Sequence, residues 1–327
     1  MSETDQLIGS LEGRARRRED RRAFFTAALG AAAVGAGAFA FASPAAAQAA
    51  SDADLLNFAL NLEYLEANYY HFAAFGTAIP TDVQGTSPGA ITGGAKVNFT
   101  DPLVSQYARE IAADELEHVR FLRSVLGLAA VAQPAINISG AANGAFSAAA
   151  QAAGLVPSGA AFDPYASDEA FLLGAYIFED VGVTAYKGAT PLIANKTLLE
   201  ATAGIMAVEG YHAALIRTTL YRKGIQTPSL QLIEATEKIS AARDQLDGVP
   251  AEDAARGIGP DDDQGIAPTS SSAGPVANIA PLNSNGLAYS RTAAQTLNIV
   301  YLNRAAVTSG GFFPAGVNGA IKSSAAN

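Results

Sequence analysis

The spacing of apolar residues predicts four long helices, because these residues recur three or four positions apart in four separate segments. The segments span about residues 51–75, 101–126, 167–189 and 196–223. Residues typical of helix N-caps open the first three, namely Ser51 or Asp52, Asp101 and Ser167, and Gly127 and Gly224 are typical helix ends. Because each predicted helix has an apolar face and a polar face, the pattern predicts an all-α bundle.

The lengths of the connecting segments predict the topology of the bundle. Residues 128–166 are long enough to run the length of a bundle and return the chain to the same end, which predicts one long crossover. We therefore expect a four-helix bundle over residues 48–224. Residues 225–327 are expected to form a C-terminal extension with helices at about 228–246 and 291–306 and an irregular segment between them.

The first 47 residues are predicted to be an export signal of the twin-arginine type. Arg21 and Arg22 precede an uncharged segment, residues 23–42, and small residues follow up to Ala47, where signal peptidase would cleave. The alternative is a transmembrane anchor, because about 20 apolar residues can span a bilayer. The twin arginines and the small-residue site favour export. We expect a periplasmic or secreted protein with no stable membrane insertion after cleavage.

The amino-acid composition limits which metal sites and which binding partners the protein can have. The chain has no Cys, which excludes disulfides and Cys-based zinc or iron–sulfur sites. An exported protein without disulfides must be stabilised by packing, by bound metal or by assembly, for example into a homo-oligomer. The net charge of −10 and the lack of a basic stripe argue against nucleic acid as a partner. Only three His occur, so their positions are informative.

Two of these histidines follow a glutamate by three positions, each within a predicted helix. Glu115 precedes His118, and Glu209 precedes His212. Because residues three apart lie on one face of a helix, one metal ion can bind both side chains of such a pair. A lone pair of this kind would be a weak signal. Two pairs on the second and fourth helices of a predicted bundle are a much stronger one.

The first and third predicted helices each contribute one further glutamate, Glu63 and Glu179. One Glu from each of two helices, with E-x-x-H from each of the other two, is the arrangement of dinuclear iron or manganese carboxylate sites in four-helix bundles. We expect Glu63 and Glu179 each to bind one ion terminally. Glu115 and Glu209 are expected to bridge the two ions, and each histidine is expected to bind one ion. The predicted ligands of two iron or manganese ions are Glu63, Glu115, His118, Glu179, Glu209 and His212.

The faces of the helices support this interpretation. Each predicted ligand lies on the apolar side of its helix. On the second helix the opposite side carries the charged residues Glu110, Asp114, Glu117 and Arg120. Four unpaired carboxylates in one core would be very costly, and two dications would offset that cost. Hard carboxylates with imidazole suit iron or manganese, and the lack of thiolate argues against copper(I) or structural zinc.

Glu66 leaves an alternative open, because its helical neighbours are also apolar. It can replace Glu63 as a ligand, bridge the ions, or support the ligands from outside. Buried tyrosines form a second open question. Tyr70, Tyr176 and Tyr186 are interpreted as core aromatics, with redox activity or hydrogen bonding to the ligands as the alternative.

Two further groups are interpreted as solvated. His71 shares its side of the first helix with polar residues and is expected at the surface, together with Asn57, Asn61, Tyr64 and Asn68. The acidic run over residues 261–263 is expected to be a solvated loop, with loose cation binding as the alternative.

Several segments resemble known families. In the first helix, Leu56-Asn57, Glu63 and Tyr70 stand at the same relative offsets as in bacterioferritin, which favours Glu63 over Glu66 as the ligand. The chain as a whole resembles the desiccation-related, ferritin-like proteins of plants, fungi and bacteria, through residues 56–67, 114–119 and 310–314. The resemblance covers about residues 52–224 and, more loosely, the tail. It implies a ferritin-like fold and iron or manganese, and no particular reaction.

Three functions are compatible with these features. The first is a dinuclear oxidoreductase of catalase, peroxidase or oxidase type, with dioxygen or hydrogen peroxide as the small-molecule substrate, acting on peroxide or free metal under stress. The second is a non-catalytic stress-protection or surface-interaction protein whose metal site is structural or vestigial. The third is iron storage in a cage, which the long loops and the extension over residues 225–327 argue against.

Overall fold

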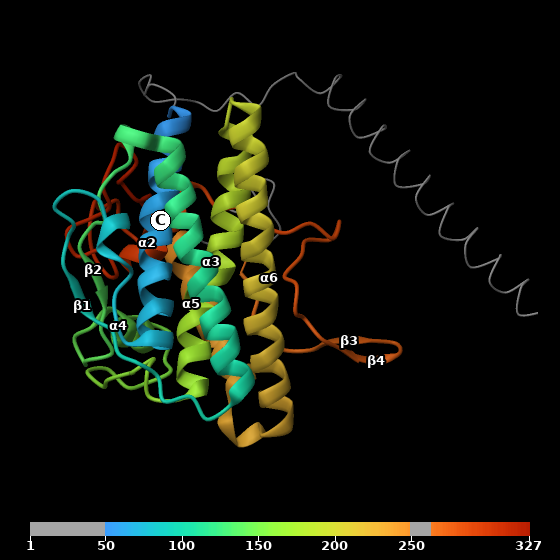
Figure 1. Ribbon diagram of the computed structural model, residues 1–327. Coiled ribbons are helices and arrows are strands. Elements are labelled where there is room, and N and C mark those ends of the chain that lie inside the picture. Colours follow the sequence, from blue (N-terminus) through green and yellow to red (C-terminus); the bar gives the residue numbers. More distant parts are fainter. Residues whose placement is uncertain (1–49, 249–262) are drawn as a thin grey trace, which may run out of the picture. The chain divides into compact units, whose positions relative to one another are not determined.

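The computed structural model describes residues 50–248 and 263–327, and four long helices form its centre. The helices are α2 (Asp52–Phe75), α3 (Pro102–Leu126), α5 (Asp168–Ala189) and α6 (Lys196–Gln226). Helix α2 packs mainly against α3, and α5 packs mainly against α6 (Figure 1). The predicted all-α bundle is confirmed. Helix α6 is longer than expected, because it continues through Gly224 and ends only before Pro228.

The start of each of the first three helices follows the predicted capping chemistry. The side chain of Ser51 accepts a hydrogen bond from the backbone N–H of Asp54 and caps α2. Asp101 caps α3, where Pro102 is the first helical residue, and Ser167 caps α5. These caps satisfy backbone N–H groups that have no partner inside the helix. The local sequence therefore sets where these helices begin.

The long crossover between α3 and α5 lies beside α2 and is tied to the α2–α3 loop (Figure 1). Strand β2 (Ile136–Ile138) of the crossover pairs in parallel with β1 (Ile91–Gly93) of that loop. Between β2 and α5 lies the short helix α4 (Ala145–Ala152). Short 3-10 turns lie in these connections at Thr81–Val83 and Gly127–Ala129, and a further one, Thr190–Leu192, lies between α5 and α6. The two strands were not predicted, because three-residue strands leave too short a pattern to recognise.

The polar side of α2 is buried, contrary to the prediction that it faces solvent. Asn57 donates to the backbone carbonyl of Ala129 at 2.9 Å, and Asn61 donates to that of Asn318 at 2.9 Å. Asn68 is fully buried, and His71 is half-buried. The crossover and the C-terminal tail cover this side of the helix, and the asparagine amides satisfy their backbone groups.

The C-terminal extension packs onto the bundle through two helices. Helix α7 (Leu232–Asp247) contacts α5 and α6, and α9 (Ala293–Tyr301) contacts α5 and α7. Within residues 225–248 and 263–327, the remaining elements are the 3-10 turn Pro228–Leu230 and the exposed hairpin of β3 (Thr269–Ser271) and β4 (Gly274–Val276). Phe312 in the tail is fully buried, and its ring lies 4.9 Å from that of Phe178 on α5. No helix among the described residues is both long and apolar enough to cross a membrane.

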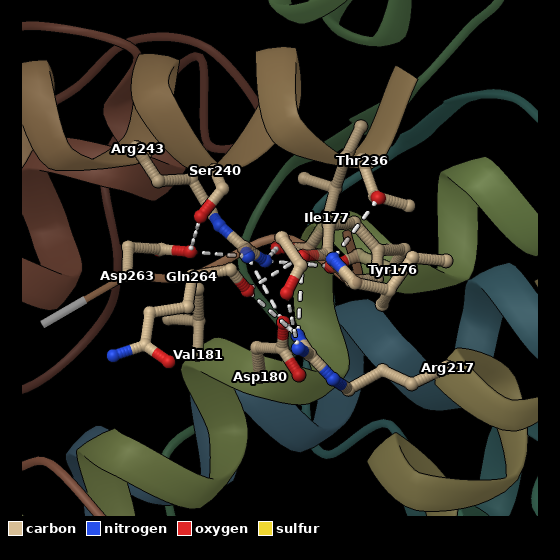
Figure 2. A network of polar contacts seen from close by, with 12 residues as sticks. Tyr176, Ile177, Asp180, Val181, Arg217, Thr236, Ser240, Arg243, Asp263 and Gln264 are labelled. Atoms are coloured by element: carbon tan, nitrogen blue, oxygen red, sulfur yellow. Dashed lines mark hydrogen bonds and ion pairs between the residues drawn. The ribbon is translucent and has the colours of Figure 1, made fainter. Parts of the chain in front are cut away.

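A buried network of arginines and aspartates joins the extension to the bundle (Figure 2). Asp180 on α5 accepts from Arg217 at 2.7 Å and from Arg243 on α7 at 3.0 Å. Arg243 also donates to Asp263 at 2.6 Å, and Arg291 donates to the second oxygen of Asp263 at 2.7 Å. The pairing of charges in the network offsets the cost of burying them.

Asp263 thereby departs from the prediction of a solvated acidic loop. It is buried, and although burial opposes the effect, the nearby guanidinium groups of Arg243 and Arg291 lower its pKa. The other two members of the run, residues 261 and 262, lie outside the described residues, as does the predicted export signal over residues 1–47. The sequence shows an acidic run here but not the arginines that reach it from other elements.

The buried network predicts a large difference between two arginine substitutions. We expect Arg243→Ala to lower the free energy of unfolding by about 3 kcal/mol or more, because it leaves the carboxylates of Asp180 and Asp263 short of a partner in the interior. Arg222→Ala removes an exposed arginine from α6 and should cost less than about 1 kcal/mol. Chemical denaturation of both variants measures the difference. Equal losses would contradict a structural role for the network.

Candidate metal centre

The structure brings all six predicted metal ligands together between the four long helices. Glu63 comes from α2, Glu115 and His118 from α3, Glu179 from α5, and Glu209 and His212 from α6. All six side chains are buried, with residue exposures between 0% and 9%. Each lies where its helix faces the bundle axis, because the spacing of the apolar residues around it fixes which side of the helix is buried.

The six residues form two groups, each gathered around one imidazole. His118 Nδ1 lies 3.2 Å from an oxygen of Glu63, 3.4 Å from one of Glu115 and 3.9 Å from one of Glu209. One potential ligand atom from each of these four residues lies within 4.8 Å of the others. Four donors from three helices therefore converge on one position.

The second group has three members. His212 Nδ1 lies 3.0 Å from the other oxygen of Glu115 and 3.7 Å from an oxygen of Glu179. Glu115 thus presents one oxygen to each group, which is the arrangement expected of a bridging carboxylate. Glu209 was expected to bridge as well, but among the described residues it belongs to the first group alone. The two positions are therefore unequal, with four protein donors at one and three at the other.

Unpaired polar atoms indicate what this arrangement can hold. Six buried atoms of the two groups have no hydrogen-bond partner within the described part of the chain: both carboxylate oxygens of Glu115 and of Glu209, one of Glu179, and Nδ1 of His212. Buried polar atoms are rarely left without partners. Carboxylate oxygen and imidazole nitrogen are donors that iron and manganese accept. The residues present therefore fit a pair of divalent cations.

The protonation behaviour of the carboxylates reflects their crowding. Burial raises the pKa of Glu63 to about 7 and the pKa of Glu179 to about 8. Burial and the neighbouring carboxylates raise the pKa of Glu209 well above its usual range. Glu115 is the exception, because the close imidazoles of His118 and His212 outweigh burial and hold its pKa below the usual range.

The two imidazoles are affected in the opposite direction. Burial by itself lowers the pKa of His118, but the carboxylates of Glu63 and Glu115 outweigh it and raise the pKa to about 11. Likewise, Glu179 and Glu115 overcome burial and raise the pKa of His212 to about 10. Among the protein groups alone, protonated imidazoles are the counter-ions of the buried carboxylates. Metal ions would take over that role and release the protons.

Three side chains outside the two groups hold the ligands in place. The hydroxyl of Tyr186 donates to Glu63, and the hydroxyl of Tyr70 donates to Glu179. Asp114 Oδ2 lies 3.1 Å from His212 Nε2, on the ring nitrogen that faces away from the carboxylates. Such contacts orient ligands and fix the imidazole tautomer.

These contacts correct parts of the sequence interpretation. Tyr70 and Tyr186 are core residues, but they also hydrogen-bond predicted ligands, which was the less favoured alternative. Tyr176 instead lies against the guanidinium of Arg243, 4.7 Å from its ring centre. Asp114 was expected in water but is half-buried beside His212. The sequence around Asp114 does not indicate this contact with His212, because His212 comes from another helix.

Gly182 and Glu66 complete the surroundings of Glu209. A Cβ at Gly182 would lie 2.1 Å from Glu209 Oε2 and 3.6 Å from Glu66 Oε1. The missing side chain of Gly182 therefore makes room for the carboxylate of Glu209. Glu66 is buried next to the centre but belongs to neither group of potential ligands among the described residues. Burial and the charge of Glu115 raise its pKa well above the usual range.

Comparison with known proteins agrees with the fold. Residues 51–222 match the model of the ferritin-like domain. The chain therefore belongs to the ferritin-like family, and within it to the group of desiccation-related proteins.

Two relatives illustrate the breadth of this group. The desiccation-related protein PCC13-62 of Craterostigma plantagineum is 34% identical over 203 residues, which cover 60% of this chain and 62% of that protein. The ferritin-like catalase Nec2 of Nesocodon mauritianus is 30% identical over 280 residues, which cover 83% of this chain and 85% of that protein. The second match extends the similarity well beyond the four-helix bundle.

Gly182 provides a test of the geometry of the centre. We expect Gly182→Ala to displace the carboxylate of Glu209 and to lower the metal content of the purified protein, because the new Cβ would overlap Oε2. Gly204→Ala is the matched control, since a Cβ at Gly204 of α6 meets no atom within 4 Å. Elemental analysis of both variants measures the effect. Full metal content in Gly182→Ala would show that Glu209 is placed differently.

Proposed function

We propose that this protein is an exported, dinuclear iron or manganese protein that consumes hydrogen peroxide. The observation that carries the proposal is the pair of buried donor groups, which share Glu115 and contain six polar atoms without partners among the described residues. The similarity to a ferritin-like catalase over 83% of this chain supports peroxide as the substrate. Manganese with a catalase-type reaction is the most specific form of the proposal.

The metal ions would supply a redox couple that exchanges two electrons with dioxygen or hydrogen peroxide. The four-donor group of Glu63, Glu115, His118 and Glu209 would hold one ion, and Glu115, Glu179 and His212 the other. A three-donor position leaves more room for a small molecule than a four-donor position does. The donor set of Glu115, Glu179 and His212 would therefore be the side of the centre with room for hydrogen peroxide.

The surrounding residues would keep the geometry constant while the charge of the centre changes. Tyr70 and Tyr186 hold the outer oxygens of Glu179 and Glu63, so neither carboxylate is free to rotate. Asp114 orients the ring of His212. Apolar core residues around the centre exclude bulk water, which strengthens every electrostatic interaction inside it. They include Ile111, Ala112, Leu172, Ala175, Ile205 and Ile216.

The location follows from the amino-terminal sequence rather than from the fold. We infer export by the twin-arginine route, because Arg21 and Arg22 precede an uncharged segment and small residues up to Ala47. This route carries folded proteins, which is compatible with metal loading before export. Peroxide removal at a periplasmic or secreted location would protect the cell surface under stress.

A second candidate is a stress-protection protein that is not a catalyst. The specific observation in its favour is the 34% identity over 203 residues to a desiccation-related protein. In this case the ions would hold the four helices together, and the redox chemistry would be absent. The extension cannot be removed cleanly to separate the two functions, because Arg217 and Asp180 of the bundle depend on residues of the extension.

Peroxide turnover distinguishes these candidates. We expect the metal-loaded protein to consume hydrogen peroxide, and Glu115→Ala to be at least about tenfold slower, since even residues that only support metal ligands contribute about 10- to 100-fold. Glu117→Ala, on the exposed side of the same helix, should match the unchanged protein. Release of oxygen from peroxide measures the rate. A metal-loaded protein no faster than Glu115→Ala would favour the non-catalytic candidate.

A further inference from the structure

A cavity of about 170 Å³ lies on the side of α5 and α6 that faces the extension. Its floor comes from both helices, and its cover is the segment over residues 279–289, here called the cover segment. Val183 and Ala213 in the floor lie one helical turn after Glu179 and Glu209, respectively. The cavity is therefore next to the helices that carry the metal centre, but it contains none of the six predicted ligands.

Hydrogen bonds hold the cover segment in place and make the cavity a formed site. Arg217 Nε donates to the backbone carbonyl of Ile279 at 2.6 Å. The hydroxyl of Tyr289 donates to the carbonyl of Leu282 at 3.0 Å and accepts from Gln264 at 2.8 Å. Because both ends of the segment are fixed by buried or half-buried groups, a ligand would meet walls that are already in position.

The lining is mostly apolar, with four polar side chains: Asp180, Thr184, Arg217 and Tyr289. The polar atoms of Thr184, Arg217 and Tyr289 already take part in hydrogen bonds within the protein. The apolar part comes from aliphatic side chains, among them Val183, Ala213, Ala214, Ile279, Pro281 and Leu282. Asp180 also lines the cavity, and its Oδ2 accepts from Arg217 and Arg243. Its Oδ1 accepts no hydrogen bond from any residue in the described ranges. A ligand would therefore find one carboxylate oxygen able to accept a hydrogen bond in mostly apolar surroundings.

The charge of Asp180 is already balanced, which decides the kind of donor that fits. The guanidinium groups of Arg217 and Arg243 lie 2.7 and 3.0 Å from its Oδ2. A cationic ligand would gain little from a carboxylate neutralised in this way. An anion has no proton to donate to Oδ1, and the N–H groups of Arg217 are already donated to Asp180 and to backbone carbonyls. A neutral hydroxyl group can donate to Oδ1 without adding charge to a buried site.

We propose that this cavity binds a neutral aromatic molecule of one ring that carries a hydroxyl group, that is, a simple phenol. The ring would occupy the apolar part, and the hydroxyl would donate to Oδ1 of Asp180. The volume suits one ring, since an apolar cavity of roughly 150 Å³ in another protein accepts benzene. The site needs neither metal nor peroxide, so it stands independently of the proposed catalysis.

Two glycines of α6 offer a matched pair of variants. Gly210 lines the cavity, and a Cβ built on it meets no atom within 4 Å. Gly204 lies on the same helix away from the cavity, is exposed, and also meets no atom within 4 Å. Leucine at either position replaces a poor helix former by a good one. Gly210→Leu would fill the cavity, whereas Gly204→Leu would place the same side chain in solvent.

The experiment is calorimetric titration of the purified full chain with three probes of similar size: p-cresol, toluene and benzoate. We expect one p-cresol per chain, bound at least about tenfold more tightly than toluene, which lacks the donor, or benzoate, which is an anion. Toluene binding as tightly as p-cresol would overturn the role of Asp180. Binding of none of the three would overturn the site.

The variants locate the binding in the cavity. Gly210→Leu should weaken p-cresol binding by about tenfold or more, and Gly204→Leu should leave it unchanged. Equal binding by both variants would place p-cresol elsewhere and overturn the proposal. Ala214→Leu, which fills the same cavity from its exposed rim, gives the same test if Gly210→Leu does not fold.

Discussion

The burial of several carboxylates between four helices is the constraint on which the rest of the structure depends. Glu63, Glu115, Glu179 and Glu209 lie in a core whose other walls are apolar, and Glu66 is buried beside them. Unpaired, such a cluster would be incompatible with a stable bundle. The two histidines, the hydroxyls of two tyrosines and the space left by Gly182 all serve to accommodate it. A pair of divalent cations would supply partners for the oxygens of Glu115, Glu179 and Glu209 that accept no hydrogen bond within the described residues.

Helix α5 connects this centre to the second buried charge cluster of the molecule. Glu179 contributes to the metal centre, and the next residue, Asp180, contributes to the arginine network on the other side of the helix. Through that network α7 and the segment around Asp263 are fixed to the bundle. The extension is thus part of the support of the helix that carries a predicted ligand. The similarity to the ferritin-like catalase likewise continues beyond the four-helix bundle.

Residues that act within one helix were predictable from the sequence. The caps of α2, α3 and α5, the crossover and the clustering of the six predicted ligands depend on local chemistry or on helical spacing, and a single sequence displays both. Contacts between distant segments were not predictable in this way. The asparagines of α2, Asp263 and Asp114 all appear to face water when only their own segment is considered. Their partners come from other elements, and neither spacing nor composition indicates which segments will cover them.

The most direct test of the account is elemental analysis of the protein purified without added metal, beside a variant that carries both Glu115→Ala and His118→Ala. The account predicts about two iron or manganese ions per chain in the unchanged protein and loss of metal in the variant, because Glu115 contributes to both donor groups. Little or no metal in the unchanged protein, or equal metal in both, would contradict a dinuclear centre at these residues.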